Sequence, residues 1–410
     1  MSNVIVAQSG GPTVAINASL VGVLAGARKC SEYDKFYGSV HGIEGVFEEN
    51  FLDLTDVYTE NSPEENMIFS TPSSYLGSCR YKLPHFNDDP ETYKKLFSIF
   101  DKYDVGAFFY IGGNDSMDTI MKLAEYGKQI GSTIRFGGVP KTVDNDLMDT
   151  DHTPGFGSAA KFIATTMLEI AHDTSVYQAD TVTIVEIMGR DAGWLTASAA
   201  LARNSYSSLP QLIYLPEVAF DKDEFIGSIK EILKKTNNIL VAISEGIHDA
   251  DGNYLSASSK AEDKFGHAQL SGTGKVLESL VKAELGIKCR SIELSLPQRC
   301  AAHISSLTDL REAAELGEKA VEFAAQGNTG YMSSIIRKPG ADYSCEIGMA
   351  DLTKVANQEK KIPREWINEA GNDVTSELID YLKPLIQGET NVKWENGLPV
   401  YKEIKHLTES

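Results

Sequence analysis

The chain has 410 residues, of which 42% are hydrophobic and 23% charged, and its formal net charge is −20. This length is enough for two or more domains with separate cores, and the composition is typical of a globular protein. The acidic balance, with no run of lysine or arginine, argues against a nucleic-acid partner, because such proteins present a basic face.

The cysteines argue against a disulfide framework and against a zinc site. They are odd in number and none has the Cys-x-x-Cys spacing: Cys30, Cys79, Cys289, Cys300 and Cys345. This pattern favours a reduced, cytoplasmic setting. The first residues enter a strand-like run without a basic flank, so we expect no signal peptide. No run approaches the roughly 18 apolar residues of a membrane span, so we expect no membrane partner.

Short apolar runs alternate with longer helical patterns along the chain. The strand candidates, in order, are Val4–Ala7, Gly106–Ile111, Ile134–Phe136, Thr181–Ile187 and Asn238–Ile243. Helical patterns cover Val14–Ala27, a segment that ends near Ile130, Leu195–Arg203 and Pro363–Gln387. This alternation predicts an α/β protein with mostly parallel sheets, whose ligands bind beyond the carboxyl ends of the strands.

The tail after Lys360 reads as an added element. The apolar residues of Pro363–Gln387 form one stripe, which we interpret as core packing, and Thr390–Lys405 has an extended or hairpin pattern. A domain boundary is expected near Asp149–Thr153. We therefore predict domains over residues 1–148 and 149–350, part of the second crossing back to the first, and an extension over 351–410.

The segment Phe136–Asp146 carries the strongest chemical pattern. It places Lys141, Asp144 and Asp146 within six positions after a Gly-Gly turn. A lysine can neutralise a phosphate, a carboxylate can accept a hydroxyl proton, and a second carboxylate can hold a divalent metal. Phosphoryl transfer needs these parts. The alternative is a solvated Asn-Asp turn.

Two glycine motifs also join a strand candidate to a helical pattern: Ser9–Thr13 and Gly112–Asp115. Glycines let phosphate oxygens approach the backbone, and a helix N-terminus favours an anion. The alternatives are an ordinary strand–helix turn for the first motif and a simple N-cap for Asp115 in the second.

The other patterns give weaker support for a functional site. Gly155–Ala160 matches a dinucleotide-binding spacing but follows Thr-Pro rather than a strand, and Ser271–Lys275 is only half a phosphate-binding loop. Ser9 and Ser116 have no evident His and Asp partners for a hydrolase. The eight histidines show no metal-ligand spacing, and we interpret them as structural or solvated. Four arginines could clamp phosphates: Arg80, Arg190, Arg290 and Arg299.

Taken together, SGGPTVAINA, GGNDS, PKTVDND, MGRDAGW, SEG and the Arg290–Arg299 segment resemble the 6-phosphofructokinase family in order and spacing, over about Val4–Gly340. The resemblance is closest to the diphosphate-dependent branch. It implies two Rossmann-like three-layer α/β domains, an active site in the interdomain cleft and a C-terminal helical extension. It also implies a cytoplasmic homodimer or homotetramer that uses Mg²⁺.

The implied reaction is reversible. A phosphoryl group passes from diphosphate to O1 of fructose 6-phosphate, giving fructose 1,6-bisphosphate and phosphate in glycolysis or gluconeogenesis. By resemblance, Asp144 is the base on the sugar 1-hydroxyl, Asp146 supports the metal or the base, and Lys141 and Asp115 complete the catalytic set. The implied diphosphate contacts are Gly11, Arg80, Gly113 and Lys141. The implied sugar-phosphate contacts are Thr142, Val143, Asp144, Met188, Gly189, Arg190, Glu245, Arg290, Leu296, Pro297, Gln298 and Arg299. The metal ligand is Asn114 or Asp115.

The choice of donor depends on two positions. ATP-using members of the family resemble GGDGS and PGTIDND, so they have glycine where this chain has Asp115 and Lys141. A carboxylate at 115 would repel the α-phosphate of ATP, and Lys141 can stabilise the leaving group when diphosphate is the donor. Three alternatives stay open: an ATP-dependent kinase of the same fold, a silent sugar-phosphate-binding subunit and a nicotinamide dehydrogenase.

The chain also departs from the family pattern. Asn114 stands where the family usually has a metal-binding aspartate, and Thr181 stands where many ATP-using members have a basic residue. Leu296 takes the place of a histidine or tyrosine, and Asp191 takes the place of a histidine that is common in the diphosphate branch. These differences leave the sugar-phosphate substrate open to alternatives such as sedoheptulose 7-phosphate.

Overall fold

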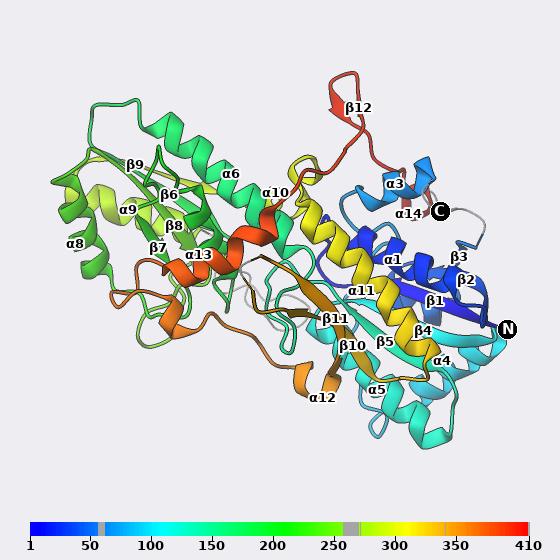
Figure 1. Cartoon of the computed structure of the whole chain (residues 1–410). Helices are drawn as coiled ribbons and strands as arrows, with labels where there is room; N and C mark the ends of the chain where they lie inside the picture. The colour runs from blue at the N-terminus through cyan, green and yellow to red at the C-terminus, as the bar shows by residue number, and fades with distance from the viewer. Residues whose placement is uncertain (56–61, 257–269, 271, 341, 409–410) are drawn as a thin grey trace. The chain divides into compact units, whose positions relative to one another are not determined.

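The computed structural model describes residues 1–55, 62–256, 270, 272–340 and 342–408. The chain forms two compact units that interleave in sequence (Figure 1). Unit 1 comprises Met1–Ser158, Arg299–Glu359 and Gly388–Ser410, and unit 2 comprises Ala159–Gln298 and Lys360–Gln387. Strands after residue 330 pair into the sheet formed by the N-terminal part, so the second half of the chain contributes to both units. The domain boundaries after residues 148 and 350 stay predictions.

Unit 1 is built on a seven-stranded sheet with the order β11-β10-β5-β4-β1-β2-β3. The strands are β1 (Ser2–Gln8), β2 (Tyr33–Ser39), β3 (Phe51–Asp53), β4 (Val105–Gly112), β5 (Arg135–Pro140), β10 (Tyr331–Arg337) and β11 (Cys345–Asp351). The β2–β3 and β10–β11 pairs are antiparallel and the other pairs are parallel. The predicted mostly parallel α/β architecture is confirmed.

Helices cover both faces of this sheet, which makes three layers. Successive residues of a strand point to opposite faces, so Val4 and Val6 pack with α1 (Ile16–Lys29) and α11 (Leu307–Ala325). Ile5 joins the core under α4 (Pro90–Lys102) and α5 (Asn114–Ile130) on the other face.

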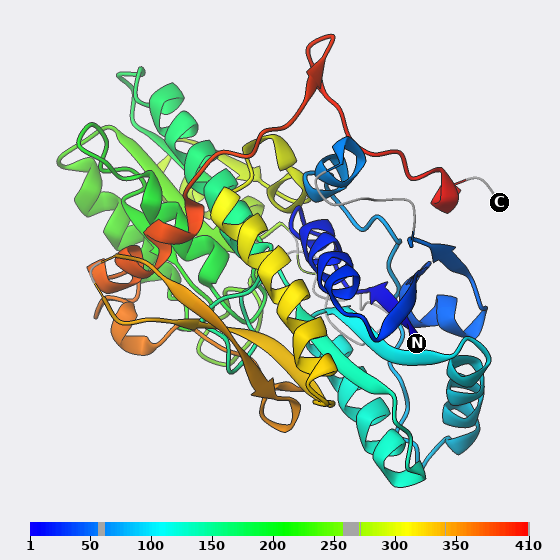
Figure 2. The ribbon, with the colours of Figure 1, turned by 45° about the vertical axis from the view of Figure 1, so that its right-hand side comes forward.

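Helices α1 and α11 lie side by side (Figures 1 and 2). Their contact leaves no room for a side chain at Gly22, where a Cβ would lie 1.9 Å from the carbonyl oxygen of Ala314. The shorter helices of unit 1 are α2 (Gly42–Phe47), α3 (Pro63–Phe69), α12 (Leu352–Val355), α14 (Lys405–Thr408) and the 3₁₀ turn η2 (Ala302–Ile304).

Unit 2 contains a four-stranded parallel sheet with the order β7-β8-β6-β9. Its strands are β6 (Thr181–Ile187), β7 (Leu212–Tyr214), β8 (Asn238–Ser244) and β9 (Lys288–Glu293). The helices after residue 155 and before residue 300 are α6 (Phe156–Thr174), α7 (Trp194–Ala197), η1 (Ser198–Ala202), α8 (Lys222–Leu233), α9 (Thr273–Leu285) and α10 (Pro297–Cys300). Side chains of β6, β7 and β8 form one core with those of α8 and α9.

The prediction of a single helix over Pro363–Gln387 was wrong. The segment contains a 3₁₀ turn η3 (Arg364–Trp366), a turn, α13 (Ser376–Leu382) and a second 3₁₀ turn η4 (Lys383–Ile386). In the turn, the side-chain oxygen of Asn368 accepts hydrogen bonds from the backbone N–H groups of Asn372 and Asp373. Such local bonds compete with a helix.

The rest of the tail agrees with the predictions. The stripe residues Leu378, Leu382 and Leu385 are buried. The expected hairpin is present as β12 (Trp394–Glu395) and β13 (Leu398–Pro399). No described helix is both long enough and apolar enough to cross a membrane.

Candidate active site

Three loops of unit 1 follow neighbouring parallel strands. Gln8 at the end of β1 pairs with Ile111 of β4, and Gly112 at the end of β4 pairs with Pro140 of β5. The carboxyl ends of these strands therefore lie in register. The motifs that begin at Ser9, Gly113 and Lys141 leave the sheet at one edge, as the sequence predicted.

The Ser9–Thr13 loop is held by its neighbours. Gly10 has a φ of 74°, which favours glycine. Its carbonyl oxygen accepts a 2.7 Å hydrogen bond from Ser78 Oγ, and its N–H donates to the carbonyl of Cys79 at 3.3 Å. These bonds attach the segment that ends in Arg80 to the predicted phosphate loop.

Lys141 is buried, with 2% of its surface exposed. Its Nζ donates to the carbonyl oxygen of Gly11 at 2.8 Å, and its backbone N–H donates to the carbonyl of Gly112 at 2.9 Å. The pKa of Lys141 is lowered to about 8, because burial and the positive charge of Arg299 outweigh the opposing charge of Asp144. An ammonium with this pKa sits among the three predicted diphosphate loops.

The Asp-Asn-Asp turn places two carboxylates close to Lys141. Asn145 adopts a left-handed backbone with φ 57°, and its side-chain oxygen accepts a 3.0 Å hydrogen bond from the N–H of Thr153. The N–H of Asp144 binds Thr142 Oγ1 at 3.2 Å. Burial, together with the charge of Asp144, raises the pKa of Asp146 to about 7. The carboxylates of Asp144 and Asp146 thus interact. Thr142 and Val143, which precede them, are half-buried.

Arg299 lies beside the glycine loop of unit 1. A Cβ added to Gly11 would be 3.2 Å from its Nη1. Burial lowers the pKa of Arg299, and the charge of Arg80 lowers it further. The sequence grouped Arg299 with the sugar-phosphate contacts. The structure places it close to Gly11, Arg80 and Lys141, which are predicted diphosphate contacts.

The start of α5 offers oxygen ligands. Asn114 Oδ1 is buried and has no hydrogen-bond partner among the described residues, and the same holds for Asp146 Oδ1. Asp115 is exposed on the first turn of the helix, directly after Asn114. No group of three or more His, Cys, Asp or Glu within the described ranges is placed to hold a metal. A Mg²⁺ ion needs only one or two protein oxygens when phosphates and waters complete its shell, so this donor set fits it.

Unit 2 brings together four of the predicted sugar-phosphate residues. The N–H of Met188 donates to Gln298 Oε1 at 3.2 Å, and the N–H of Gly189 donates to Glu245 Oε1 at 3.3 Å. Gly189 has a φ of 138°, and a Cβ there would lie 2.7 Å from the carbonyl oxygen of Ala192. The Met188–Gly189 turn after β6 is therefore fixed against the end of β8.

The remaining predicted residues of unit 2 lie at different distances from this turn. Arg190 follows it directly and is half-buried, and a Cβ on Gly246 would overlap its carbonyl oxygen at 1.8 Å. Leu296 and Pro297 are exposed in the segment before Gln298. Arg290 lies apart, exposed on the edge strand β9 opposite Thr183.

One residue that positions this loop was missed. A carboxylate oxygen of Glu217 accepts from the N–H of Gly193 at 2.8 Å and from the N–H of Ile362 at 3.1 Å. Burial raises its pKa, although these bonds oppose the shift. No motif surrounds Glu217 in the sequence, so only the fold identifies it.

The structure removes the dinucleotide alternative at Gly155–Ala160. The N–H groups of Gly155 and Ser158, at the start of α6, donate to the carboxylate of Asp309 at 2.9 and 3.0 Å. The helix N-terminus where a pyrophosphate would bind is thus occupied by a side chain of the chain itself. For the half P-loop, Ser271 lies outside the described residues.

Comparisons with known proteins identify the family of this chain. Residues 3–324 match the family described as Phosphofructokinase. The chain belongs to the phosphofructokinase family. It is similar to a Halomonas elongata protein named pyrophosphate–fructose 6-phosphate 1-phosphotransferase, with 40% identity over 99% of this chain and 97% of that protein. A Rhodospirillum rubrum protein of the same name is 41% identical, with coverages of 93% and 94%. The solved pyrophosphate-dependent phosphofructokinase from Nitrosospira multiformis aligns with a TM-score of 0.87 and 39% identity, over 98% of this chain and 96% of that one.

Proposed function

We propose that this phosphofructokinase transfers a phosphoryl group reversibly from diphosphate to O1 of fructose 6-phosphate, giving fructose 1,6-bisphosphate and phosphate. The observation that carries the proposal is the buried ammonium of Lys141, which contacts the Gly11 carbonyl and interacts with Asp144 and Asp146. A protein keeps such a costly cation where negative charge has to be stabilised.

The residues of unit 1 supply both a base and positive charge. Asp144 accepts the proton of the sugar 1-hydroxyl as its oxygen attacks the terminal phosphorus of diphosphate in line. Lys141 stabilises the charge that develops on the departing phosphate, with Arg80 and Arg299 adding positive potential beside Gly11. In the reverse direction Asp144 returns the proton.

The same geometry supports diphosphate as the donor. The side chain of Lys141 reaches back to the Gly11 carbonyl and fills space that a glycine at this position would leave open. Asp115 adds a carboxylate on the first turn of α5. A large, strongly charged nucleotide would meet both groups, whereas diphosphate requires only the glycine loop and the cations.

Magnesium fits the oxygen atoms of this unit. The ion would be held by Asn114 Oδ1 and Asp146 Oδ1 together with phosphate oxygens of the donor. Both protein atoms are buried and have no hydrogen-bond partner among the described residues. Asp115, the residue after Asn114, adds an exposed carboxylate. When bound, the ion neutralises charge on the transferring group.

We assign recognition of fructose 6-phosphate to the turn of unit 2 that carries Met188, Gly189 and Arg190, and to Glu245. Glu245 can accept hydrogen bonds from sugar hydroxyls, and Arg190 can bind phosphate. The homodimeric or homotetrameric assembly and the cytoplasmic setting stay predictions from the family resemblance.

The test compares diphosphate and ATP, each with Mg²⁺ and fructose 6-phosphate. We expect turnover with diphosphate and little with ATP. Asp144→Ala should lower kcat by a factor of about 10²–10⁴ while calorimetry still detects substrate binding, and Asp101→Ala, an exposed site on α4, should change neither. Turnover with ATP alone would overturn our interpretation of Asp115 and Lys141, and no turnover with either donor would favour a silent subunit or another sugar phosphate.

A further inference from the structure

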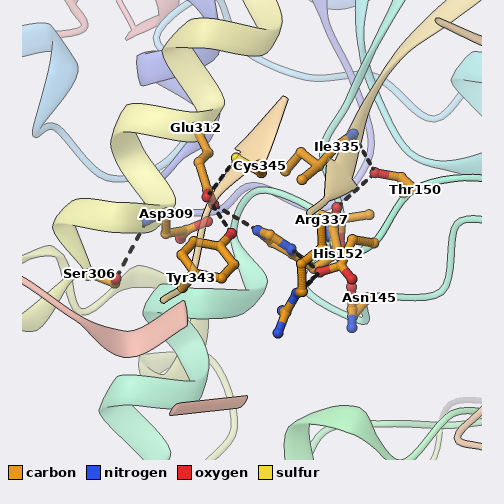
Figure 3. A network of polar contacts seen from close by, with 12 residues as sticks. Asn145, Thr150, His152, Ser306, Asp309, Glu312, Ile335, Arg337, Tyr343 and Cys345 are labelled. Carbon is orange, nitrogen blue, oxygen red and sulfur yellow. Dashed lines mark hydrogen bonds and ion pairs between the residues drawn. The ribbon is translucent and has the colours of Figure 1, made fainter. Parts of the chain in front are cut away.

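A second polar network of unit 1 lies outside the residues assigned above. At its centre is His152, whose side chain is buried with 2% exposure (Figure 3). Its Nδ1 lies 2.8 Å from Asp151 Oδ2, and its Nε2 lies 2.7 Å from Glu312 Oε2. No motif distinguishes this histidine from the other seven in the sequence.

The geometry determines the protonation of this ring. An ionised carboxylate only accepts hydrogen bonds, and a neutral imidazole donates from one nitrogen only. Since both nitrogens of His152 face carboxylate oxygens, both must donate, so the ring is an imidazolium. Burial alone would lower its pKa, but the hydrogen bonds and charges of Asp151 and Glu312 raise it to about 9.

The network joins the segment after Asp146 to two other elements of unit 1. Glu312 belongs to α11, and Asp151 binds Arg337 of β10 through Nε at 3.0 Å and Nη2 at 2.9 Å. The N–H of Asp151 also donates to the carbonyl of Ile335 in β10 at 2.8 Å. His152 is thus the bridge between helix α11 and the strand β10.

The residue after His152 holds the catalytic turn directly. Thr153 donates from its N–H to Asn145 Oδ1 at 3.0 Å and from its Oγ1 to the carbonyl of Thr142 at 2.8 Å. Asn145 stands between the two predicted catalytic aspartates in a left-handed backbone. A displacement of residues 151–153 would therefore move Asp144 through two hydrogen bonds.

We infer that His152 is a positioning residue, whose imidazolium joins Asp151 to Glu312 and thereby holds the Asp144-bearing turn in its reactive geometry. If the proton leaves, one of the two hydrogen bonds is lost and two carboxylates face each other without the cation between them. The inference rests on the proposed function only for its kinetic part.

The environment of the ring supports a single charge change at alkaline pH. The groups that face the network from the elements packed on it are Asp151, Asp309 and Glu312 as acids, Arg337 as the other cation, and Tyr343 and Cys345. Burial and the Glu312 carboxylate raise the pKa of Tyr343 well above its ordinary range and that of Cys345 to about 12. Of His152, Tyr343 and Cys345, His152 is then the group that loses its proton first as the pH rises above neutrality.

The first measurement needs no activity. In the ligand-free full chain labelled with ¹⁵N-histidine, one ring should show imidazolium signals on both nitrogens up to about pH 9, and His152→Gln should remove that signal. A ring that is already neutral at pH 7 would overturn the inference, whatever substrates the enzyme uses.

The second measurement is kinetic and follows turnover of the wild-type enzyme with diphosphate. His152→Gln should lower kcat about 10–100-fold, as small displacements of catalytic groups do, with each KM within about threefold. Hydrogen exchange should increase in residues 142–155 and stay unchanged in β1 and β4. The control His172→Gln, exposed near the end of α6, should match wild type.

Glu312→Gln keeps an acceptor for Nε2 but removes one charge, so it tests the inference even if His152→Gln does not fold. It should retain kcat near pH 6.5, and its alkaline loss of kcat should begin at least about one pH unit lower than in wild type. Glu322→Gln, exposed on the same helix, should not shift the profile. An unshifted profile in Glu312→Gln, or kcat within twofold of wild type in His152→Gln, would refute a positioning role.

Discussion

Replacing Lys141 by methionine should separate stability from activity. The ammonium is buried, and burial lowers its pKa from the ordinary 10.5 to about 8. That fall corresponds to about 3 kcal/mol of unfavourable free energy for keeping the charge in the folded chain. Methionine has a similar length and no charge, so it removes this cost. It also removes the hydrogen bond of the ammonium to the Gly11 carbonyl, a loss of about 1–2 kcal/mol.

The expected net effect at pH 7 is a stabilisation of about 1–2 kcal/mol. Its pH dependence follows from the direction of the shift. Below about pH 8 Lys141 is protonated in both the folded and the unfolded chain, and the whole unfavourable free energy of its buried charge is present. Between about 8 and 10.5 only the unfolded chain keeps it, so the cost fades as the pH rises and the advantage of Lys141→Met fades with it.

The assay pairs calorimetric melting of the ligand-free chain with steady-state kinetics. Lys141→Met should melt a few degrees higher than wild type at pH 7 and lose a factor of about 10²–10³ in kcat with diphosphate. Lys230→Met, at an exposed position on α8, should change neither quantity. A Lys141→Met enzyme that melts lower and keeps more than a tenth of its activity would show that the lysine has a structural role and no part in the reaction.

Two further predictions concern the same unit. Burial and Asp144 raise the pKa of Asp146 to about 7, and the pKa of Lys141 falls to about 8. We therefore expect kcat/KM of the free enzyme to rise through about pH 7 and to fall again above about pH 8. Asp146→Asn should lose the acidic limb of this profile, and an unchanged profile would contradict a role of Asp146 in the reaction. Because Arg299 lies beside Gly11, Arg299→Met should raise KM for diphosphate by about tenfold or more; a change confined to KM for fructose 6-phosphate would return Arg299 to the sugar-phosphate side.

The sequence predicted the strands that carry the chemistry because they are buried on both faces. Thr181–Ile187 was located without error, since a short run rich in β-branched residues between two polar segments favours a buried strand. The predicted helix over Pro363–Gln387 failed for the opposite reason. Its apolar stripe was real, but side-chain bonds of Asn368 end the helical pattern, and such bonds depend on which residues the turn brings together.

The candidate site divides in the same way. Motifs next to strand ends, such as the Lys141–Asp146 segment, were predictable because parallel strands deliver their following residues to one edge. Residues that act on these motifs from a distance in sequence were not. Glu217 and Glu312 are single carboxylates within ordinary helical or turn sequences, and their partners are more than twenty residues away. Only the folded chain shows that Glu312 is buried and Glu217 half-buried, each in contact with a segment next to a predicted site loop.

Several features of unit 1 that are unfavourable for folding are concentrated in residues 141–146. Lys141 is charged where burial disfavours charge, Asp146 shares a buried site with Asp144, and Asn145 has a left-handed backbone. An isolated loop would relieve each cost by moving toward solvent. The hydrogen bonds from Thr153 and the ion pairs of His152 oppose that movement, because they attach the segment to helix α11 and strand β10. Weakening that attachment should therefore release the segment before it unfolds the sheet, so turnover should respond to substitutions at His152 under conditions where the protein remains folded.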